Sequence, residues 1–352
     1  MDVRRARLTV LLVVLTMLAA ACSSGKVSTT APSGSSPPAG PVTLRLGYLP
    51  NLTQASAVVG VQEGIFTKSL GAGVDFKPGT FKAGPDEVTA LLSGALDAAF
   101  IGPNPAVNAF LTSSGAIKIV SGATSGGAYL MTKYAIKSAA DLKGQKVASP
   151  EVGNTQDVAL RSWLKSQGLN PSPGGDVTVV PQSNATTLQQ FQQGLIAGAW
   201  VPEPWASRLQ VEGGAKVFLD ESTLWPPDGR YATTVLVVRT DYARAHRDVV
   251  TNLLIGQVAA NEVVKAKSAQ AQNDAAAAIK ALTGQTLSQA VSDLSWIHLT
   301  FTNDPIASSI ATDAARAKDL GLVKSTNLSG LYDLSELNGI LKSVNEPQVS
   351  AG

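Results

Sequence analysis

Short polar side chains lie where predicted strands end and predicted helices begin, and their chemistry suits an anion. Asn154, Thr155 and Gln156 open one such helix, where backbone N–H groups lack helical partners and the helix dipole favours negative charge. Such N–H groups, together with hydroxyls and side-chain amides, can satisfy an oxyanion without a buried Arg or Lys. The remaining candidates of this kind are Tyr48, Asn51, Asn104, Thr124, Ser125 and Gly126.

Most of these candidates also have a purely structural interpretation. Asn104 and Asn154 could each cap a helix, and Gly126, in the small-residue loop 124–127, could form a tight hinge turn. Tyr48 could contribute a hydroxyl to a ligand or close the core. The residue types do not decide between these roles, so all of them stay candidates for ligand binding.

A further stretch, residues 200–205, places two aromatic rings on either side of a carboxylate. Trp200 and Trp205 could wall the apolar part of an organic anion, or they could pack in the core. Glu203 would repel an anion unless it is paired with an Arg, receives a ligand's ammonium group, or points into solvent at a helix start. We keep all three residues as ligand-binding candidates.

The rarity of Cys and His excludes most catalytic and metal chemistry. The chain of 352 residues has one Cys and two His, so neither a Cys cage nor a His-rich metal site can form. We expect His246 and His298 to be structural or solvent-facing and remote from the polar loops. A nucleophile elbow would need Ser where Thr124 stands, and no Walker sequence is present. We therefore predict a protein without catalytic residues, metal or cofactor.

The charge balance excludes a nucleic-acid partner. The sequence has 28 Lys and Arg against 26 Asp and Glu, a net charge of +2, and no basic cluster. An anion site in such a chain must depend on local dipoles and N–H groups rather than on long-range attraction.

The first forty residues are typical of an export signal followed by a tether. Residues 1–21 combine three Arg with a short apolar run, and small residues precede Cys22, as in a lipobox. Cys22 would then carry lipid and anchor the protein on the outer side of the cell membrane; the alternative is a plain secretory signal with an incidental Cys. Residues 22–41 are rich in Ser, Thr, Pro and Gly and predict a flexible tether.

From residue 42 onward, strand-like and helix-like stretches alternate, which predicts mainly parallel sheets with helices on both faces. The pattern restarts near residue 141, and residues 94–105 are echoed by residues 194–204, each a buried strand ending in Pro-x-Pro. We therefore expect two lobes joined by two crossings, with a ligand cleft between them. Lobe 1 would comprise residues 42–130 and 234–352, including a helical C-terminal part, and lobe 2 residues 131–233.

Five sequence motifs, in order along residues 44–239, resemble substrate-binding lipoproteins of ABC importers in the aliphatic sulfonate/nitrate/taurine-binding family. The resemblance implies the type II periplasmic-binding-protein fold, an α/β fold with two lobes that close on a small ligand and deliver it to permease transmembrane subunits. The motifs are Gly-Tyr-Leu-Pro at 47–50, Phe-Ile-Gly-Pro-Asn-Pro-Ala at 100–106, Ser-Gly-Ala-Thr-Ser-Gly-Gly at 121–127, Gly-Asn-Thr-Gln-Asp at 153–157 and Trp-Val-Pro-Glu-Pro-Trp at 200–205.

The resemblance leaves the ligand open. An aliphatic sulfonate is the favoured oxyanion; nitrate, taurine or a thiamine pyrimidine precursor are the alternatives. Two other classes of function also share this fold: an enzyme of the pyrimidine-synthesis type, disfavoured because that synthesis depends on histidine chemistry, and a membrane-anchored ligand sensor or adaptor. We expect a monomer outside the cytoplasm, held to the membrane by its lipid anchor.

Overall fold

The computed structural model describes residues 40–352 of the chain. The predicted export signal, Cys22 and nearly all of the predicted tether lie outside the described residues. Among residues 40–352, no helix is both long enough and apolar enough to cross a membrane.

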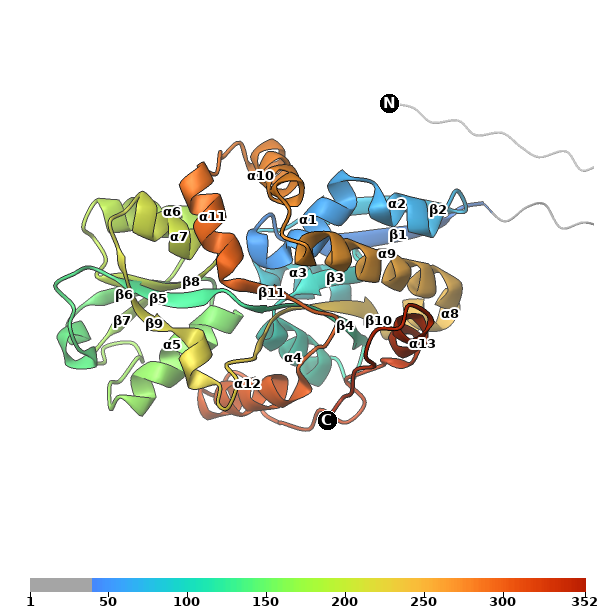
Figure 1. Cartoon of the computed structure of the whole chain (residues 1–352). Coiled ribbons are helices and arrows are strands. Elements are labelled where there is room, and N and C mark those ends of the chain that lie inside the picture. The colour runs from blue at the N-terminus through green and yellow to red at the C-terminus, as the bar shows by residue number, and fades with distance from the viewer. Residues whose placement is uncertain (1–39) are drawn as a thin grey trace, which may run out of the picture. The chain divides into compact units, whose positions relative to one another are not determined.

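Two separate sheets organise the described chain (Figure 1). In the first sheet, β10 and β11 run antiparallel to their neighbours, and β1 to β3 pair in parallel. In the second sheet, β5 is antiparallel to β8 and β9, whereas β6 pairs in parallel with β7 and β8. The first sheet has the order β11 (Leu299–Phe301), β4 (Ile117–Gly126), β10 (Ala232–Arg239), β3 (Ala98–Ile101), β1 (Val42–Tyr48) and β2 (Val74–Thr80). The second has the order β7 (Thr178–Pro181), β6 (Lys146–Ser149), β8 (Gly198–Pro202), β5 (Ala128–Thr132) and β9 (Lys216–Asp220).

Each sheet with its helices forms one lobe, named lobe 1 and lobe 2 for the first and second sheet. The chain passes from β4 into β5 and returns from β9 through the short helix η3 (Glu221–Leu224) into β10. The two strands that enter a sheet from the other lobe, β5 and β10, run antiparallel to both of their neighbours, and β11 runs antiparallel to β4. The two-lobed α/β arrangement predicted from the sequence is thus confirmed, but both sheets are mixed rather than mainly parallel.

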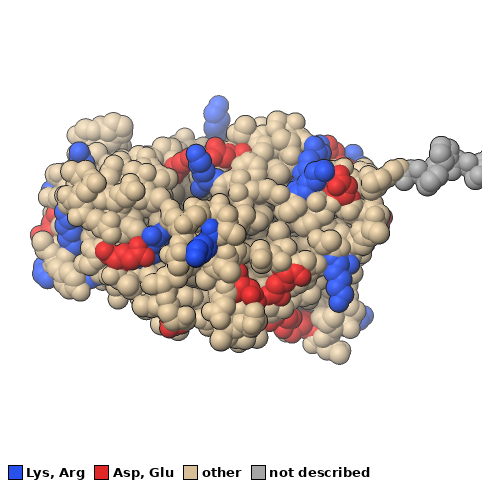
Figure 2. All heavy atoms as spheres, turned by 90° about the horizontal axis from the view of Figure 1, so that it is seen from above, with Lys and Arg blue, Asp and Glu red and all other residues tan. Residues whose placement is uncertain are grey.

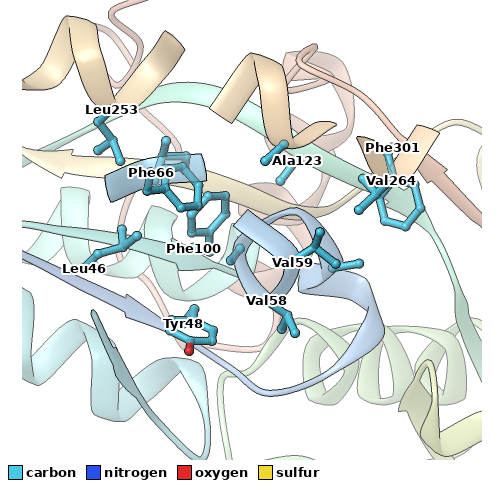
Figure 3. Packing of buried hydrophobic residues seen from close by; sticks show 14 of the residues in the cluster. Leu46, Tyr48, Val58, Val59, Phe66, Phe100, Ala123, Leu253, Val264 and Phe301 are labelled. Atoms are coloured by element: carbon cyan, nitrogen blue, oxygen red, sulfur yellow. The ribbon is translucent and has the colours of Figure 1, made fainter. Parts of the chain in front are cut away.

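Helices cover both faces of the first sheet and bury two apolar layers. The larger layer contains Phe66 and Phe100, whose ring centroids lie 6.0 Å apart, together with Leu46 and Leu253 (Figure 3). Its helices are α1 (Ala55–Gln62), α2 (Ile65–Leu70), α8 (Thr240–Ala245), α9 (Arg247–Lys265), α10 (Ala269–Thr283) and α13 (Ser335–Ser343). The other layer is formed by α3 (Gly84–Leu92), α4 (Pro103–Thr112) and α12 (Ala307–Asp319).

The second sheet is covered in the same way. Helix α5 (Thr155–Ser166) packs on one face around Trp163 and Trp200, while α6 (Asn184–Gln192) and α7 (Trp205–Val211) pack on the other. Apolar layers on both faces explain why the central strand β8 reads as a short, fully buried apolar run in the sequence.

The predicted echo between the two lobes is confirmed at the level of backbone geometry. Gly94 follows α3 and Gly194 follows α6, and both have a φ of +78°, a left-handed conformation that glycine adopts without steric cost. Phe100 in β3 and Trp200 in β8 are both fully buried. The same helix–turn–strand unit therefore occurs once in each lobe.

The C-terminal part differs from a simple helical completion of lobe 1. It contains a short strand, β11, which pairs with β4 and was not predicted. Helix α11 (Gln289–Ile297) packs against α7 of lobe 2, and α12 packs against both α4 and α5 (Figure 1). Both lobes therefore share this segment.

Candidate ligand-binding site

A small cavity lies between the carboxyl ends of strands from both lobes, the place where α/β sheets bind ligands. Its volume is about 80 Å³. Lobe 1 contributes the segment after β1, the loop after β2, the start of α4 and β10, and lobe 2 contributes the starts of α5 and α6. The lining residues are Leu49, Asn51, Thr53, Gln54, Lys82, Ala83, Gly102, Pro150, Glu151, Asn154, Thr155, Gln156, Gln182, Ser183, Asn184, Pro202, Thr233 and Thr234. We call this space the inner cavity.

The start of α5 is held rigidly in place. The N-cap Asn154 accepts the Thr155 N–H through Oδ1 at 2.8 Å. Asp157, one turn into the helix, accepts from the Gly153 N–H at 3.0 Å and from the Ser149 hydroxyl at 2.7 Å. The loop before α5 is thereby tied to its first turn, so the cavity wall from Asn154 to Gln156 is preorganised.

Thr155 presents an unused polar group in this wall. Its side chain is buried, and its Oγ1 has no hydrogen-bond partner among the described residues. A buried hydroxyl without a partner costs roughly 1–3 kcal/mol. A ligand with acceptor oxygens in the inner cavity would remove that cost.

In the lobe 1 wall, two side-chain amides use their oxygens within the protein. The Thr53 hydroxyl donates to Oδ1 of Asn51 at 2.7 Å, and the Leu49 N–H donates to Oε1 of Gln54 at 2.6 Å. Because the amide oxygens are occupied, the amide nitrogens of Asn51 and Gln54 are left to donate to a ligand. The opposing walls therefore offer donors from both lobes.

One cation and one carboxyl group line the inner cavity. Lys82 is exposed in the loop after β2, and Glu151 precedes α5. Burial raises the pKa of the Glu151 carboxyl above its ordinary value, the nearby Asp86 raises it further, and Lys82 opposes this. The Glu151 carboxylate would repel an anion, and the Lys82 ammonium beside it opposes that repulsion.

The two lobes touch beside the inner cavity. A methyl group placed on Gly102, at the start of α4, would come within 2.5 Å of Oγ1 of Thr155 in lobe 2. Gly102 has a φ of −67°, so its backbone would accept another residue. Close approach of the lobes, rather than backbone conformation, requires glycine at this position.

Of the twelve predicted ligand-binding residues, four line the inner cavity: Asn51, Asn154, Thr155 and Gln156. The capping interpretation of Asn154 also holds, since it caps α5 and lines the cavity at once. These four residues come just after a strand or at the start of a helix. Such positions lie at the edge of the sheet where the cavity forms, so sequence position alone was enough to identify them.

Five predicted residues lie elsewhere in lobe 1. Tyr48 is 3% exposed and belongs to the apolar layer (Figure 3). Asn104 caps no helix; its Nδ2 donates to the Asp313 carbonyl at 3.2 Å and ties α4 to α12. Thr124, Ser125 and Gly126 do not form a loop, because they continue β4 and pair with β10 and β11.

None of the three candidates at 200–205 lines the inner cavity. Trp200 is fully buried in lobe 2, and its Nε1 donates to Oε2 of Glu221 at 2.7 Å. Glu203 is fully buried and not solvated; its partners are Ser207, Ser295 and His298 rather than an Arg. The expectation that His298 lies away from the motifs was wrong.

Trp205 lines a second, wider space beside the inner cavity. This space has a volume of about 440 Å³, and we call it the outer chamber. It is lined by Leu49, Pro50, Asn51, Thr80, Phe81, Lys82, Ser183, Asn184, Ala185, Pro204, Trp205, Arg208, Ile279, Leu282, Thr283, Gln285 and Leu287.

The sequence reasoning did not identify the parts of the inner cavity formed by the start of α6 and by β10. Ser183 caps α6 by accepting the Thr186 N–H at 3.2 Å, and Asn184 follows it with a buried Oδ1 that has no partner in the described chain. The same strand–polar–helix pattern that identified residues 154–156 is present here and could have found them. Thr233 and Thr234 gave no local signal, because β10 reaches the cavity only through the return crossing.

The charged side chains give no extended basic surface on the face seen in Figure 2, where Lys, Arg, Asp and Glu are scattered among neutral atoms. This distribution agrees with the small net charge of the sequence.

Comparison with known proteins supports the two-lobed fold. The alkanesulfonate-binding protein SsuA from Xanthomonas axonopodis pv. citri, bound to MOPS, has a TM-score of 0.68 at 20% identity, covering 82% of this chain and 96% of that one. The nitrate-binding protein NrtA from Synechocystis PCC 6803 has a TM-score of 0.73 at 16% identity, covering 87% of this chain and 90% of that one. At these identities the likeness shows the fold.

Sequence comparison gives the family. A Brucella abortus (strain 2308) protein named as a binding protein is 32% identical over 165 residues, 46% of this chain and 49% of the relative. This chain thus spans about half the length of the curated relative it matches. Residues 37–280 match the NMT1-like family. The chain therefore belongs to the NMT1-like family.

Proposed function

We propose that this protein is the extracytoplasmic substrate-binding component of an ABC importer and that its inner cavity captures a small organic oxyanion. The favoured ligand is an aliphatic sulfonate, which the lobes would enclose and deliver to the permease transmembrane subunits. The observation that carries the proposal is the buried, unpartnered Thr155 hydroxyl beside the inner cavity.

The chemistry of the cavity wall supports an oxyanion over a cation or an apolar molecule. The amide nitrogens of Asn51 and Gln54, the hydroxyl of Thr155 and the ammonium group of Lys82 can all donate to a ligand. The starts of α5 and α6 lie in the same wall, and helix N-termini favour negative charge. A sulfonate has three acceptor oxygens and stays ionised at physiological pH, so it can use several of these donors at once.

Two solved structures with this fold are named for the anions they bind, and they support the same class of ligand. The names of SsuA and NrtA give alkanesulfonate and nitrate respectively. Taurine, nitrate and a thiamine pyrimidine precursor are the competing ligands for this chain. A sensor that binds the same ligand without importing it is the competing role.

We further propose the chain organisation expected from the sequence. Residues 1–21 would be removed, Cys22 lipidated and residues 22–41 would serve as the tether. The boundaries expected from the sequence, residues 42–130 and 234–352 for lobe 1 and 131–233 for lobe 2, each cut a strand, because β5 spans Ala128–Thr132 and β10 spans Ala232–Arg239. Lobe 1 would therefore comprise residues 42–127 and 232–352, and lobe 2 residues 128–231. The protein would act as a monomer anchored on the outer surface of the membrane.

Calorimetry on the purified chain tests the ligand. Ethanesulfonate, taurine, nitrate and a pyrimidine precursor are titrated separately, and small-angle scattering follows compaction. We expect saturable binding of ethanesulfonate with a smaller radius of gyration. Binding of nitrate or the pyrimidine alone would replace the ligand, and binding of none would refute the proposal. Deletion that abolishes uptake of the bound ligand would separate import from sensing.

A further inference from the structure

The outer chamber adjoins the inner cavity. Both spaces share five lining residues: Leu49, Asn51, Lys82, Ser183 and Asn184. A ligand whose head group lies in the inner cavity could therefore extend a second part past these shared residues into the chamber.

The chamber differs from the inner cavity in size and in chemistry. Its volume is about 440 Å³, against about 80 Å³ for the inner cavity. Three separate parts of the chain supply apolar surface: Phe81 after β2, Trp205 in α7, and Ile279, Leu282 and Leu287 around the end of α10. Leu282 is 43% exposed, so burying it against a ligand would gain free energy.

The charged residues of the chamber do not favour binding of a second anionic group. Arg208 pairs with Glu212 in the same helix, with Nη2 3.0 Å from Oε2. Its guanidinium lies over the Trp205 ring, 4.7 Å from the centroid, and donates to Oε1 of Gln285. Because Arg208 is already paired, Lys82 at the junction of the two spaces is the lining cation left to attract an anion.

We propose that the outer chamber is a subsite for the apolar tail of the ligand, so that the protein selects organic oxyanions with an extended hydrocarbon tail. This inference rests on the proposed function, because the oxyanion head must occupy the inner cavity. A bare inorganic anion such as nitrate fills only the inner cavity and gains nothing from the chamber. Trp205, a predicted ligand contact, would then touch the tail rather than the head.

A chain-length series tests the subsite. Methane-, butane- and octanesulfonate are titrated into the purified full chain by calorimetry. Burial of one methylene is worth about 0.8 kcal/mol, so we expect affinity to rise about threefold to fourfold per methylene until the chamber is filled. Leu282→Ser and Trp205→Ala should each reduce the octane-to-methanesulfonate affinity ratio.

The matched control is Leu195→Ser, which removes a leucine that is 58% exposed and does not line the chamber. Its affinity ratio should equal that of the unaltered protein. Methanesulfonate binding without any gain along the series would refute the subsite and leave the proposed function intact. A gain that both chamber variants retain would place the tail elsewhere. Failure of all sulfonates to bind would refute the sulfonate as the ligand in the proposed function, and the subsite with it.

Discussion

The imidazole Nδ1 of His298 lies 2.8 Å from Oε1 of Glu203, and this contact joins the end of α11 to the strand–helix turn of lobe 2. The Glu203 carboxylate also accepts from Ser207 and from the Ser295 hydroxyl at 3.0 Å. The Tyr129 ring packs on the imidazole, with centroids 4.8 Å apart. A motif that suggested ligand binding thus holds the C-terminal segment against lobe 2.

Replacement of this carboxylate should destabilise the protein. Glu203→Ala leaves several buried donors without an acceptor, so the free energy of unfolding should fall by about 3 kcal/mol, measured by urea denaturation. Glu262→Ala is the control: its exposed carboxylate pairs with Lys265 at 2.8 Å, and such pairs contribute about 0–1 kcal/mol. If the Glu203 variant has normal stability but loses ligand affinity, Glu203 acts in ligand binding instead.

The Thr155 hydroxyl should contribute to ligand affinity. Thr155→Val keeps the shape of the side chain and removes the donor, and losing a hydrogen bond to a charged ligand costs roughly 1.5–3 kcal/mol. We expect sulfonate affinity to fall about tenfold to a hundredfold in calorimetry, and further when Gln156→Ala is added. Thr132→Val is matched, because Thr132 is equally buried and unpartnered but lies in β5 away from the cavity. Equal affinities in all three proteins would refute the role of Thr155.

The sequence predicted those features of the structure that depend on a few consecutive residues. The alternation of strands and helices, the repeated turn at Gly94 and Gly194, and the polar start of α5 each depend on a few consecutive residues. These features appear in the structure where the sequence placed them. The same local reasoning identified Asn51 and Asn154 as cavity residues.

The missed features depend on partners far away in the sequence. Ser125 belongs to a strand because Ala232 and Thr300 pair with it from opposite sides, and no pattern around residue 125 contains that information. Glu203 and His298 are 95 residues apart. Burial and pairing at these positions follow from how the C-terminal segment returns to lobe 2, which a single sequence does not reveal.

Two buried carboxyl groups beside the return crossing should make stability depend on pH. Burial raises the pKa of Glu221 to about 7 and that of Asp313 to about 8. Arg316 lies 3.4 Å from Asp313 and over the Trp225 ring. Arg316 and the Trp200 N–H lower the pKa of Glu221, whereas Asp220 raises it. Arg316 also lowers the pKa of Asp313, whereas Glu221 raises it.

Both groups bind protons more tightly when folded, so the stability they contribute is present below their ordinary values of 4.5 and 3.8 and is lost as pH rises through about 7 and 8. Denaturant titrations between pH 5 and about pH 9 measure this loss. Glu221→Gln and Asp313→Asn imitate the protonated groups and should lose less stability than the unaltered protein over that range. Identical profiles for all three proteins would show that these carboxyl groups do not cause the dependence.

The membrane anchor should depend on Cys22, the single cysteine of the sequence. Cys22→Ala removes the thiol that would carry lipid, so the protein should move from the membrane to the soluble fraction and lose incorporation of labelled fatty acid. Ser23→Ala, at the next position, should leave both unchanged. Continued fatty-acid labelling of the Cys22 variant would refute the lipobox.

Because Gly102 lies close to Thr155, a larger residue at position 102 should limit how far the lobes can close. An alanine methyl at position 102 would lie 2.5 Å from Oγ1 of Thr155, so Gly102→Ala must either displace that hydroxyl or hold the lobes slightly apart. Both outcomes weaken the donor geometry, and we expect sulfonate affinity to fall several-fold, with a ligand-induced compaction smaller than in the unaltered protein. Gly79→Ala in β2 is the control, since no atom lies within 4 Å of the added methyl group. Normal affinity and normal compaction of the Gly102 variant would show that the cavity does not need this contact between the lobes.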